Sequence, residues 1–242
     1  ETCERVAEYL GLSNGKASTN GKPSTTPAGK GQSVLDRIAA AKHCPADSLR
    51  SYGAKEARGK LHLPMYTWQD SKPVRCSVFS MDATGKGMNA KGKPAGMFFP
   101  GHDAKGQMDA PGAGETWVIC EGVKDAAALH GLGYHVVGLP GNRIKKEWVE
   151  AFPGVNVTII PDADKAGEGG AAETAKMLAG VAASVKIARL PVPHKDTCGL
   201  DTRDAIRLAG VFAVRACIAD AAPAGEDGTP AEPAEPPAFL TL

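Results

Sequence analysis

Apolar residues in the second half of the chain fall into short runs that alternate with amphipathic segments. The runs are rich in β-branched residues and bounded by turn residues, which is typical of buried parallel strands. They cover residues 116–120, 136–140, 155–160 and 183–190. The segments between and after them have the apolar spacing of helices, at 124–132, 143–151, 168–180, 202–209 and 211–220. This alternation predicts an α/β fold in which helices flank a parallel sheet.

The first half of the chain has a different pattern. Residues 33–41 and 46–50 have the apolar spacing of two short helices. The following runs alternate apolar and polar residues as strands do, and a Gly-containing turn separates the last two. These runs cover residues 61–66, 76–81 and 95–100. We therefore expect a small α+β unit before the parallel sheet.

Composition divides the chain into four consecutive parts. Residues 1–32 begin with a short amphipathic segment and continue as a Gly-, Ser- and Thr-rich stretch, which predicts a short helix and a flexible linker. Residues 33–112 hold the α+β unit, and residues 113–220 hold the parallel sheet with its C-terminal helices. Residues 221–242 are rich in Pro, Ala and Glu, which predicts a disordered tail.

Bulk composition excludes several classes of protein. The formal net charge is only +1, so any contact with nucleic acid must come from a local basic patch. Aromatic residues make up 5% of the chain, which disfavours a sheet that stacks bases. No apolar stretch is long enough to predict a membrane span. The six cysteines are scattered without a Cys-x-x-Cys pair, so we expect a reducing, cytoplasmic setting and no zinc in this chain.

Acidic residues directly follow two of the predicted parallel strands. Glu121 comes after the run at 116–120, and Asp162 and Asp164 come just after the run at 155–160. Ligands bind at the carboxyl ends of strands in open α/β sheets, so these acids are expected to meet there. Carboxylates placed together repel one another unless a cation lies between them, and Mg²⁺ suits oxygen ligands and phosphates. The pattern favours metal-dependent chemistry on a phosphate, with Mg²⁺ or Mn²⁺ as the cofactor. The alternative is that these are ordinary turn carboxylates at strand ends.

The same residues carry a family resemblance. Glu121-Gly-Val-Lys-Asp125 after one strand and Asp162-Ala-Asp-Lys-Ala-Gly167 after another resemble a TOPRIM domain over about residues 115–205. That family includes bacterial-type primases, topoisomerases of types IA and II, and several nucleases. The resemblance implies that Asp162 and Asp164 bind Mg²⁺ and that Glu121 acts in acid–base work or binds metal.

The resemblance also implies roles for further acids, and each of these acids has an alternative interpretation. Asp125 stands where primases of this family place an additional acid, although the helix dipole alone favours an acid in a first turn. Asp201 and Asp204 match the third acidic motif of the family, which implies that they bind metal, and Asp196 is the alternative. Asp201 is equally placed to be the N-cap of a helix.

The segment before the TOPRIM-like residues also resembles a known part of primases. It is similar to the small basic subdomain of bacterial and phage primases, whose lysines contact nucleotide phosphates and template. The resemblance implies this role for Lys86, Lys91 and Lys93, and the alternative is that they are solvated turn lysines. Residues after the second parallel strand form a basic cluster that is expected to contact nucleotide or template: Asn142, Arg143, Lys145 and Lys146.

The resemblance as a whole is to the catalytic core of bacterial and phage-type DNA primases. It implies template-dependent synthesis of short RNA primers by two-metal nucleotidyl transfer. The expected partners are a single-stranded DNA template, NTPs and a replicative helicase, either as a domain or as a separate protein. Two alternatives stay open on sequence grounds, a TOPRIM metal-dependent nuclease and a non-catalytic nucleic-acid-binding relic. The basic subdomain favours the primase.

Overall fold

The computed structural model describes residues 32–103, 105 and 107–229. The helix and linker expected for residues 1–32 lie outside these residues apart from Gln32, and so does the segment 230–242 of the expected tail. Within the described part of the chain, no helix is both long enough and apolar enough to cross a membrane.

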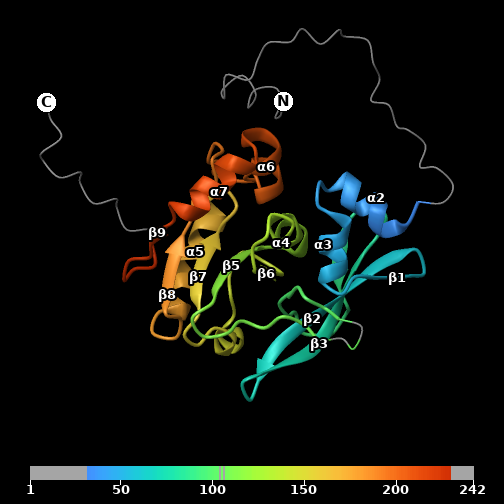
Figure 1. The fold of residues 1–242 in the computed structure, drawn as a ribbon, viewed down its shortest axis with the longest axis horizontal. Coiled ribbons are helices and arrows are strands. Elements are labelled where there is room, and N and C mark those ends of the chain that lie inside the picture. Colours follow the sequence, from blue (N-terminus) through green and yellow to red (C-terminus); the bar gives the residue numbers. More distant parts are fainter. Residues whose placement is uncertain (1–31, 104, 106, 230–242) are drawn as a thin grey trace, which may run out of the picture. The chain divides into compact units, whose positions relative to one another are not determined.

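The first half of the described chain forms an antiparallel sheet preceded by two short helices (Figure 1). The strands lie in the order β1-β2-β3-β4. Asp70 and Ser71, which connect β2 to β3, both have positive φ angles, as a tight hairpin turn requires. The elements are α2 (Val34–Ala41), α3 (Ala46–Ser51), β1 (Lys55–Ala57), β2 (Lys60–Gln69), β3 (Lys72–Met81) and β4 (Gly87–Asn89). The expected α+β unit is confirmed, with β2 and β3 longer than the apolar runs that predict them.

Residues 95–100 do not form the strand that their apolar run predicts. Met97 pairs with Tyr66 of β2, whereas the next residue, Phe98, pairs with Gly138 in the second half of the chain. Successive residues of extended backbone direct their N–H and C=O groups to opposite sides. This segment therefore links two sheets instead of belonging to either.

The second sheet has the strand order β6-β5-β7-β8-β9. The pairs β5–β6, β5–β7 and β7–β8 are parallel, and β9 is antiparallel to β8. The strands are β5 (Thr116–Glu121), β6 (Val136–Leu139), β7 (Asn156–Ile160), β8 (Ser184–Ile187) and β9 (Ala222–Pro223). The predicted α/β fold with a parallel sheet is confirmed.

The helices of the second half alternate with these strands: α4 (Val123–His130), η1 (Lys146–Ala151), α5 (Lys165–Leu178), α6 (Thr202–Ala209) and α7 (Val211–Ala219). The helix expected at 143–151 is a short 3₁₀ helix, η1. Disorder from residue 221 onward is a wrong expectation for residues 221–229. Ala222 and Pro223 pair with β8, and the Ala224 N–H donates to the Val185 carbonyl at 2.9 Å, so backbone pairing orders a segment of polar composition.

Two apolar cores cover the two faces of the parallel sheet. On one face, Val118 and Cys120 of β5 belong to a cluster with α4 and with Leu61 and Leu63 of β2. On the other face, Trp117 of β5 belongs to a cluster with η1, α5 and the aromatic residues of β2. Successive residues of a strand point to opposite faces, which explains the division. Both cores draw on β2, so the antiparallel and parallel sheets are packed together.

We predict that Tyr52→Phe lowers the free energy of unfolding by about 1 kcal/mol, because a buried carbonyl loses a side-chain donor. Tyr52 is 1% exposed, and its hydroxyl donates to the Val136 carbonyl at 2.8 Å, joining the end of α3 to β6. Urea denaturation measures the change. Tyr134→Phe is the matched control, since that ring lies under the Arg215 guanidinium and no described group bonds its hydroxyl. Equal stabilities for the two variants would contradict the prediction.

Candidate active site

The parallel pairing of β5 and β7 brings the predicted acids to one edge of the sheet. Cys120 of β5 lies opposite Ile160 of β7 in the last pair of that ladder, and Glu121, the last residue of β5, lies opposite Leu139 of β6. Glu121 follows Cys120 directly, and Asp162 follows Ile160 after one proline. Both acids therefore leave the sheet at its carboxyl edge, where ligands of open α/β sheets bind.

Asp162 has the most strongly shifted pKa of the acids at this edge of the sheet. Burial is the largest cause that raises its pKa to about 8, and the nearby charges of Asp125, Glu121, Asp201 and Asp164 contribute to the same shift in that order. No described side chain donates a hydrogen bond or forms an ion pair with its carboxylate. An ionised Asp162 is therefore uncompensated by the protein itself, and a bound cation would stabilise the charged form.

Glu121 is half-buried and belongs to the same cluster. Burial raises its pKa, and the charge of Asp164 raises it further. The electrostatic effects of these acids on one another show that Glu121, Asp162 and Asp164 lie close together. The structure thus brings together the three acids that the sequence singles out, although their chemical roles remain predictions.

Asp164 differs from the other two because backbone groups stabilise its charge. It is the N-cap of α5, and its two carboxylate oxygens accept from the Gly167 and Gly199 N–H groups, each at 2.8 Å. These hydrogen bonds lower the pKa of Asp164. Gly199 belongs to the loop after β8, whose Lys195 N–H donates to the Ala163 carbonyl at 3.0 Å. The loop therefore holds Asp164 ionised and in a fixed orientation.

Asp125 lies on the first turn of α4 and is only 5% exposed. Burial and the charge of Asp201 raise its pKa, while Arg203 opposes the shift. The Arg203 guanidinium donates to Asp125 at 3.1 Å and also bonds Asp201. Burial opposes the charge on Arg203, but the two carboxylates outweigh burial and raise its pKa. One arginine thus compensates two acids at the rim of the cluster.

The acids of the expected third motif have different surroundings in the structure. Asp201 is the N-cap of α6, accepting from the Asp204 N–H at 2.9 Å, and it is among the charges that raise the pKa of Asp162. Asp204 pairs instead with Arg207 at 3.2 Å. Asp196 is exposed in the loop before α6. Both interpretations of Asp201 therefore have support, since it caps a helix and lies beside the acids.

The donor set fits an Mg²⁺ ion that is shared with a substrate. Among residues 32–103, 105 and 107–229, no group of three or more His, Cys, Asp or Glu side chains is arranged to hold a metal ion by itself. Mg²⁺ commonly takes one or two carboxylates and completes its octahedron with water and phosphate oxygens. The uncompensated carboxylates of Glu121 and Asp162 meet that smaller requirement.

Basic residues beside the acids were not singled out by the sequence. Burial lowers the pKa of Lys124, and the charges of Arg203 and Lys42 lower it further, so these three cations lie close together. The Lys124 ammonium also donates to the Gly85 carbonyl of the turn between β3 and β4 at 3.4 Å. Lys124 and Arg203 stand within the acidic motifs, which is a usable signal, whereas nothing in the local sequence marks Lys42.

The predicted cluster after β6, apart from Lys146, lines a pocket of about 270 Å³ together with Asn89 and Ala95 of the first half. The Asn142 side chain donates to the Ala166 carbonyl in the first turn of α5 at 2.7 Å. Arg143 pairs with Glu173 at 2.5 Å, and the Lys145 ammonium lies 5.0 Å above the Trp148 ring. Asn142 therefore lies at the edge of the sheet near Asp164, and the two cations project from the same loop.

The lysines of the expected basic subdomain occupy exposed turns. The Lys86 N–H donates to the Asp82 carboxylate at 3.2 Å within the turn between β3 and β4. Lys91 and Lys93 follow β4, and Lys93 lines a shallow pocket of about 280 Å³ with Arg75. Gly85 touches both Lys42 and Lys124, so the turn that carries Lys86 lies beside the acidic cluster.

Comparison with known protein families finds a match over the residues of this edge. Residues 118–200 match the Toprim-like family, and they include Glu121, Asp162 and Asp164. The name Toprim-like domain denotes this matched segment. Among curated protein sequences, none matches the chain.

Solved structures similar to the chain include three with primase parts. The DnaG catalytic core aligns at 18% identity with a TM-score of 0.46, over 73% of this chain and 60% of that one. The Aquifex aeolicus primase, with its zinc-binding and RNA polymerase domains, aligns at 15% identity and a TM-score of 0.46, over 72% and 45%. A structure of bacteriophage T7 lagging-strand DNA polymerase interacting with primase domains aligns at 18% and 0.45, over 76% of both chains. This chain thus spans about half of the length of the first two.

We predict that Asp162→Asn stabilises the metal-free protein increasingly as the pH rises from 5 to 8. The folded-state pKa of Asp162 is raised to about 8, so its contribution to stability is full below the ordinary carboxyl pKa and is lost as the pH rises through 8. Asparagine does not titrate. The difference in unfolding free energy should reach the order of a few kcal/mol near pH 8. Urea denaturation in EDTA measures it, and a difference that is constant with pH would contradict the prediction.

Proposed function

We propose that the chain is the catalytic part of a DNA primase, which joins ribonucleotides on a single-stranded DNA template. The observation that carries the proposal is the pair of partly buried, uncompensated carboxylates of Glu121 and Asp162 beside the fixed, ionised Asp164. They stand at the carboxyl edge of a Toprim-like domain. Such a site favours binding of a cation together with an anionic substrate, and a nucleoside triphosphate satisfies both requirements.

Each acid has a distinct part in this proposal. Glu121, Asp162 and Asp164 would hold Mg²⁺ or Mn²⁺, which when bound neutralises phosphate charge and activates an attacking hydroxyl. Burial and the charge of Asp164 raise the pKa of Glu121, so it is a stronger proton acceptor than an ordinary glutamate. Asp164 is already oriented by two backbone N–H groups, so it provides a fixed ligand that needs no reorganisation. Arg203 keeps Asp125 and Asp201 from adding further uncompensated charge.

The antiparallel sheet supports polymerisation over hydrolysis. Its β3–β4 turn carries Lys86 and reaches the acidic cluster through the hydrogen bond from Lys124 to Gly85. Cations on that side would bind the triphosphate or the template backbone by charge attraction. A nuclease needs no such second element to position an incoming nucleotide. A replicative helicase as a partner and a cytoplasmic setting remain predictions from the sequence.

We predict that Asp162→Asn abolishes primer synthesis while the protein stays folded. The test incubates each protein with single-stranded template, Mg²⁺ or Mn²⁺ and labelled NTPs, and separates the products on a gel. Loss of one carboxylate from a metal site commonly costs orders of magnitude in rate, so synthesis should fall by at least about 100-fold. Asp70→Asn, in the β2–β3 turn, is the control, because Asn also tolerates the positive φ found there.

The products of this assay separate the candidate functions. Short ribonucleotide products that depend on Asp162 support the primase. Shortened template strands whose formation depends on Asp162 would indicate a metal-dependent nuclease instead of a primase. Template binding with neither product, from a protein whose stability Mg²⁺ does not change, would indicate a nucleic-acid-binding protein without catalysis.

We also predict that Lys91→Gln/Lys93→Gln weakens binding of single-stranded DNA and lowers its salt dependence. The chain has a net charge of only +1, so affinity must rest on local cations, and both lysines are exposed after β4. The slope of log affinity against log salt should fall by about one unit for each lost phosphate contact. Lys176→Gln/Lys186→Gln is the control on α5 and β8. Equal salt slopes for both double variants would show that Lys91 and Lys93 are solvated turn residues.

A further inference from the structure

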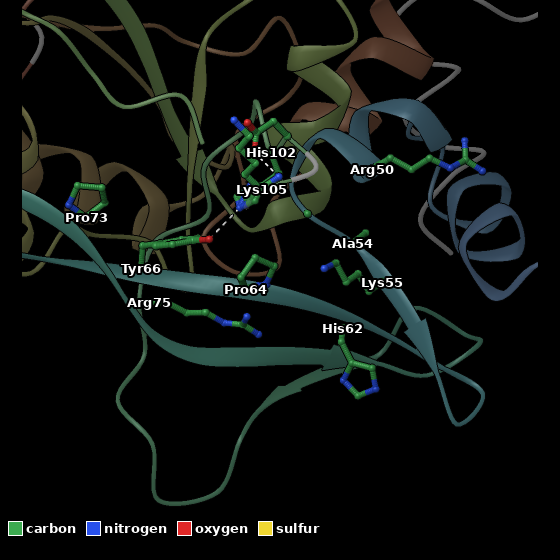
Figure 2. A pocket seen from close by; sticks show the side chains of 12 residues that line it. Arg50, Ala54, Lys55, His62, Pro64, Tyr66, Pro73, Arg75, His102 and Lys105 are labelled. Carbon is green, nitrogen blue, oxygen red and sulfur yellow. Dashed lines mark hydrogen bonds between the residues drawn. The ribbon is translucent and has the colours of Figure 1, made fainter. Parts of the chain in front are cut away.

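A pocket of about 560 Å³ lies against the antiparallel sheet (Figure 2). Its walls come from the end of α3, from β1, β2 and β3, and from the segment after Gly101. It shares no residue with the acidic cluster of the Toprim-like domain. Its lining is rich in cationic and imidazole side chains: Arg50, Lys55, His62, Arg75, His102 and Lys105.

Strand register explains how these residues meet. His62, Pro64 and Tyr66 alternate along β2, so their side chains share one face of the sheet. Lys55 of β1 lies opposite His62, and Arg75 of β3 lies opposite Tyr66. Three strands therefore deliver basic and ring-bearing side chains to the same side.

Positive charge in this pocket is only partly compensated. Arg50 is held by Asp36 and Asp47 at 3.3 and 2.6 Å, but neither Lys55 nor Arg75 forms an ion pair with any acid of the described residues. Asp103 is the acid on the lining, and its carboxylate accepts the N–H groups of Lys105 and Gln107 at 2.8 and 2.9 Å. An anion placed between Lys55 and Arg75 would therefore meet two cations that form no ion pair with a described acid, while Asp103 and Asp109 are the carboxylates that act on the inner wall.

The inner wall is built from packed rings. The Tyr66 hydroxyl lies 3.1 Å from the His102 Nε2 atom, and the two rings meet edge to face at 5.5 Å. His102 lies over Gly53, where a Cβ atom would come within 2.5 Å of the imidazole. Burial lowers the pKa of His102, Lys55 and Arg75 lower it further, and the carboxylates of Asp103 and Asp109 oppose the shift. Figure 2 shows Tyr66 and His102 joined at the inner wall, with Pro64 beside them.

We propose that this pocket binds the phosphate of a nucleotide, at a site separate from the acidic cluster. Pockets of roughly 300–1,000 Å³ hold small ligands, and this volume exceeds what inorganic phosphate alone would fill. Lys55 and Arg75 supply charge-assisted hydrogen bonds to phosphate oxygens. Tyr66, Pro64 and Pro73 supply flat surfaces for a sugar or base. The nucleotide is either free or the 5′-phosphorylated end of a strand, since both present the same terminal phosphate.

The test measures binding of ATP and of inorganic pyrophosphate by calorimetry in EDTA, so that no metal supports binding at the acidic cluster. Lys55→Gln/Arg75→Gln should weaken binding of both ligands by about tenfold or more, because two charged hydrogen-bond donors are lost. Lys60→Gln/Lys72→Gln is the matched control. It removes the same charge from exposed positions of β2 and β3 outside the pocket, and it should change affinity less than about twofold.

A second measurement separates the sources of the phosphate. Short DNA strands with a 5′-phosphate or a 5′-hydroxyl are compared with ATP on the same proteins. Tight binding of ATP alone indicates a free nucleotide, and a preference for the 5′-phosphorylated strand that Lys55→Gln/Arg75→Gln abolishes indicates a strand end. If both strands bind equally and ATP does not bind, the protein contacts the DNA backbone and not a terminal phosphate, and the proposal is overturned. Unchanged ATP and pyrophosphate affinity in the pocket variant would overturn it outright. Because these measurements need neither metal nor synthesis, they stand whether or not the chain is a primase.

Discussion

Mutual repulsion among carboxylates at the carboxyl edge of the parallel sheet is the constraint on which the rest of the site depends. β5 and β7 are neighbours, so the acids that follow them cannot avoid one another. The protein compensates this charge unequally. Asp164 receives two backbone N–H groups and Asp125 receives an arginine, while Asp162 and Glu121 receive neither. The uncompensated pair marks where an external cation contributes most to stability.

The compensating groups come from segments far apart in the sequence. Gly199 lies in the loop after β8, and Arg203 lies on α6, yet both act on acids that follow β5 and β7. Arg203 also donates to the Lys42 carbonyl at 3.2 Å, which ties the end of α2 to the same site. Correct assembly of the acidic cluster therefore requires the whole described fold, and its electrostatics report on the packing of α2, α4 and α6 together.

The sequence predicts the parts of the site that depend on local periodicity. A strand followed by an acid places Glu121 and Asp162 at a sheet edge, and the α/β alternation makes those strands parallel neighbours. Arg203 could not be assigned because the burial of Asp125 depends on how α4 packs against α6, which no local pattern encodes. The sequence does not predict the basic pocket for a similar reason. Lys55, Arg75 and His102 are distant in sequence and meet only through antiparallel register and the path of the segment after Gly101.

The link at residues 97–98 has a consequence for how the chain can be divided. Met97 bonds β2 in both directions, and Phe98 bonds Gly138 of β6 in both directions, so one extended dipeptide closes two sheet edges at once. Phe98 is 2% exposed and lies in the core that also holds Leu61 and Val118. A fragment cut between the sheets would lose the hydrogen bonds at Met97 and Phe98. It would also leave the edge of β6 and an apolar face open to water. The Toprim-like domain is thus a recognisable unit of sequence without being a detachable unit of folding, and fragments that preserve its structure must begin upstream of β2.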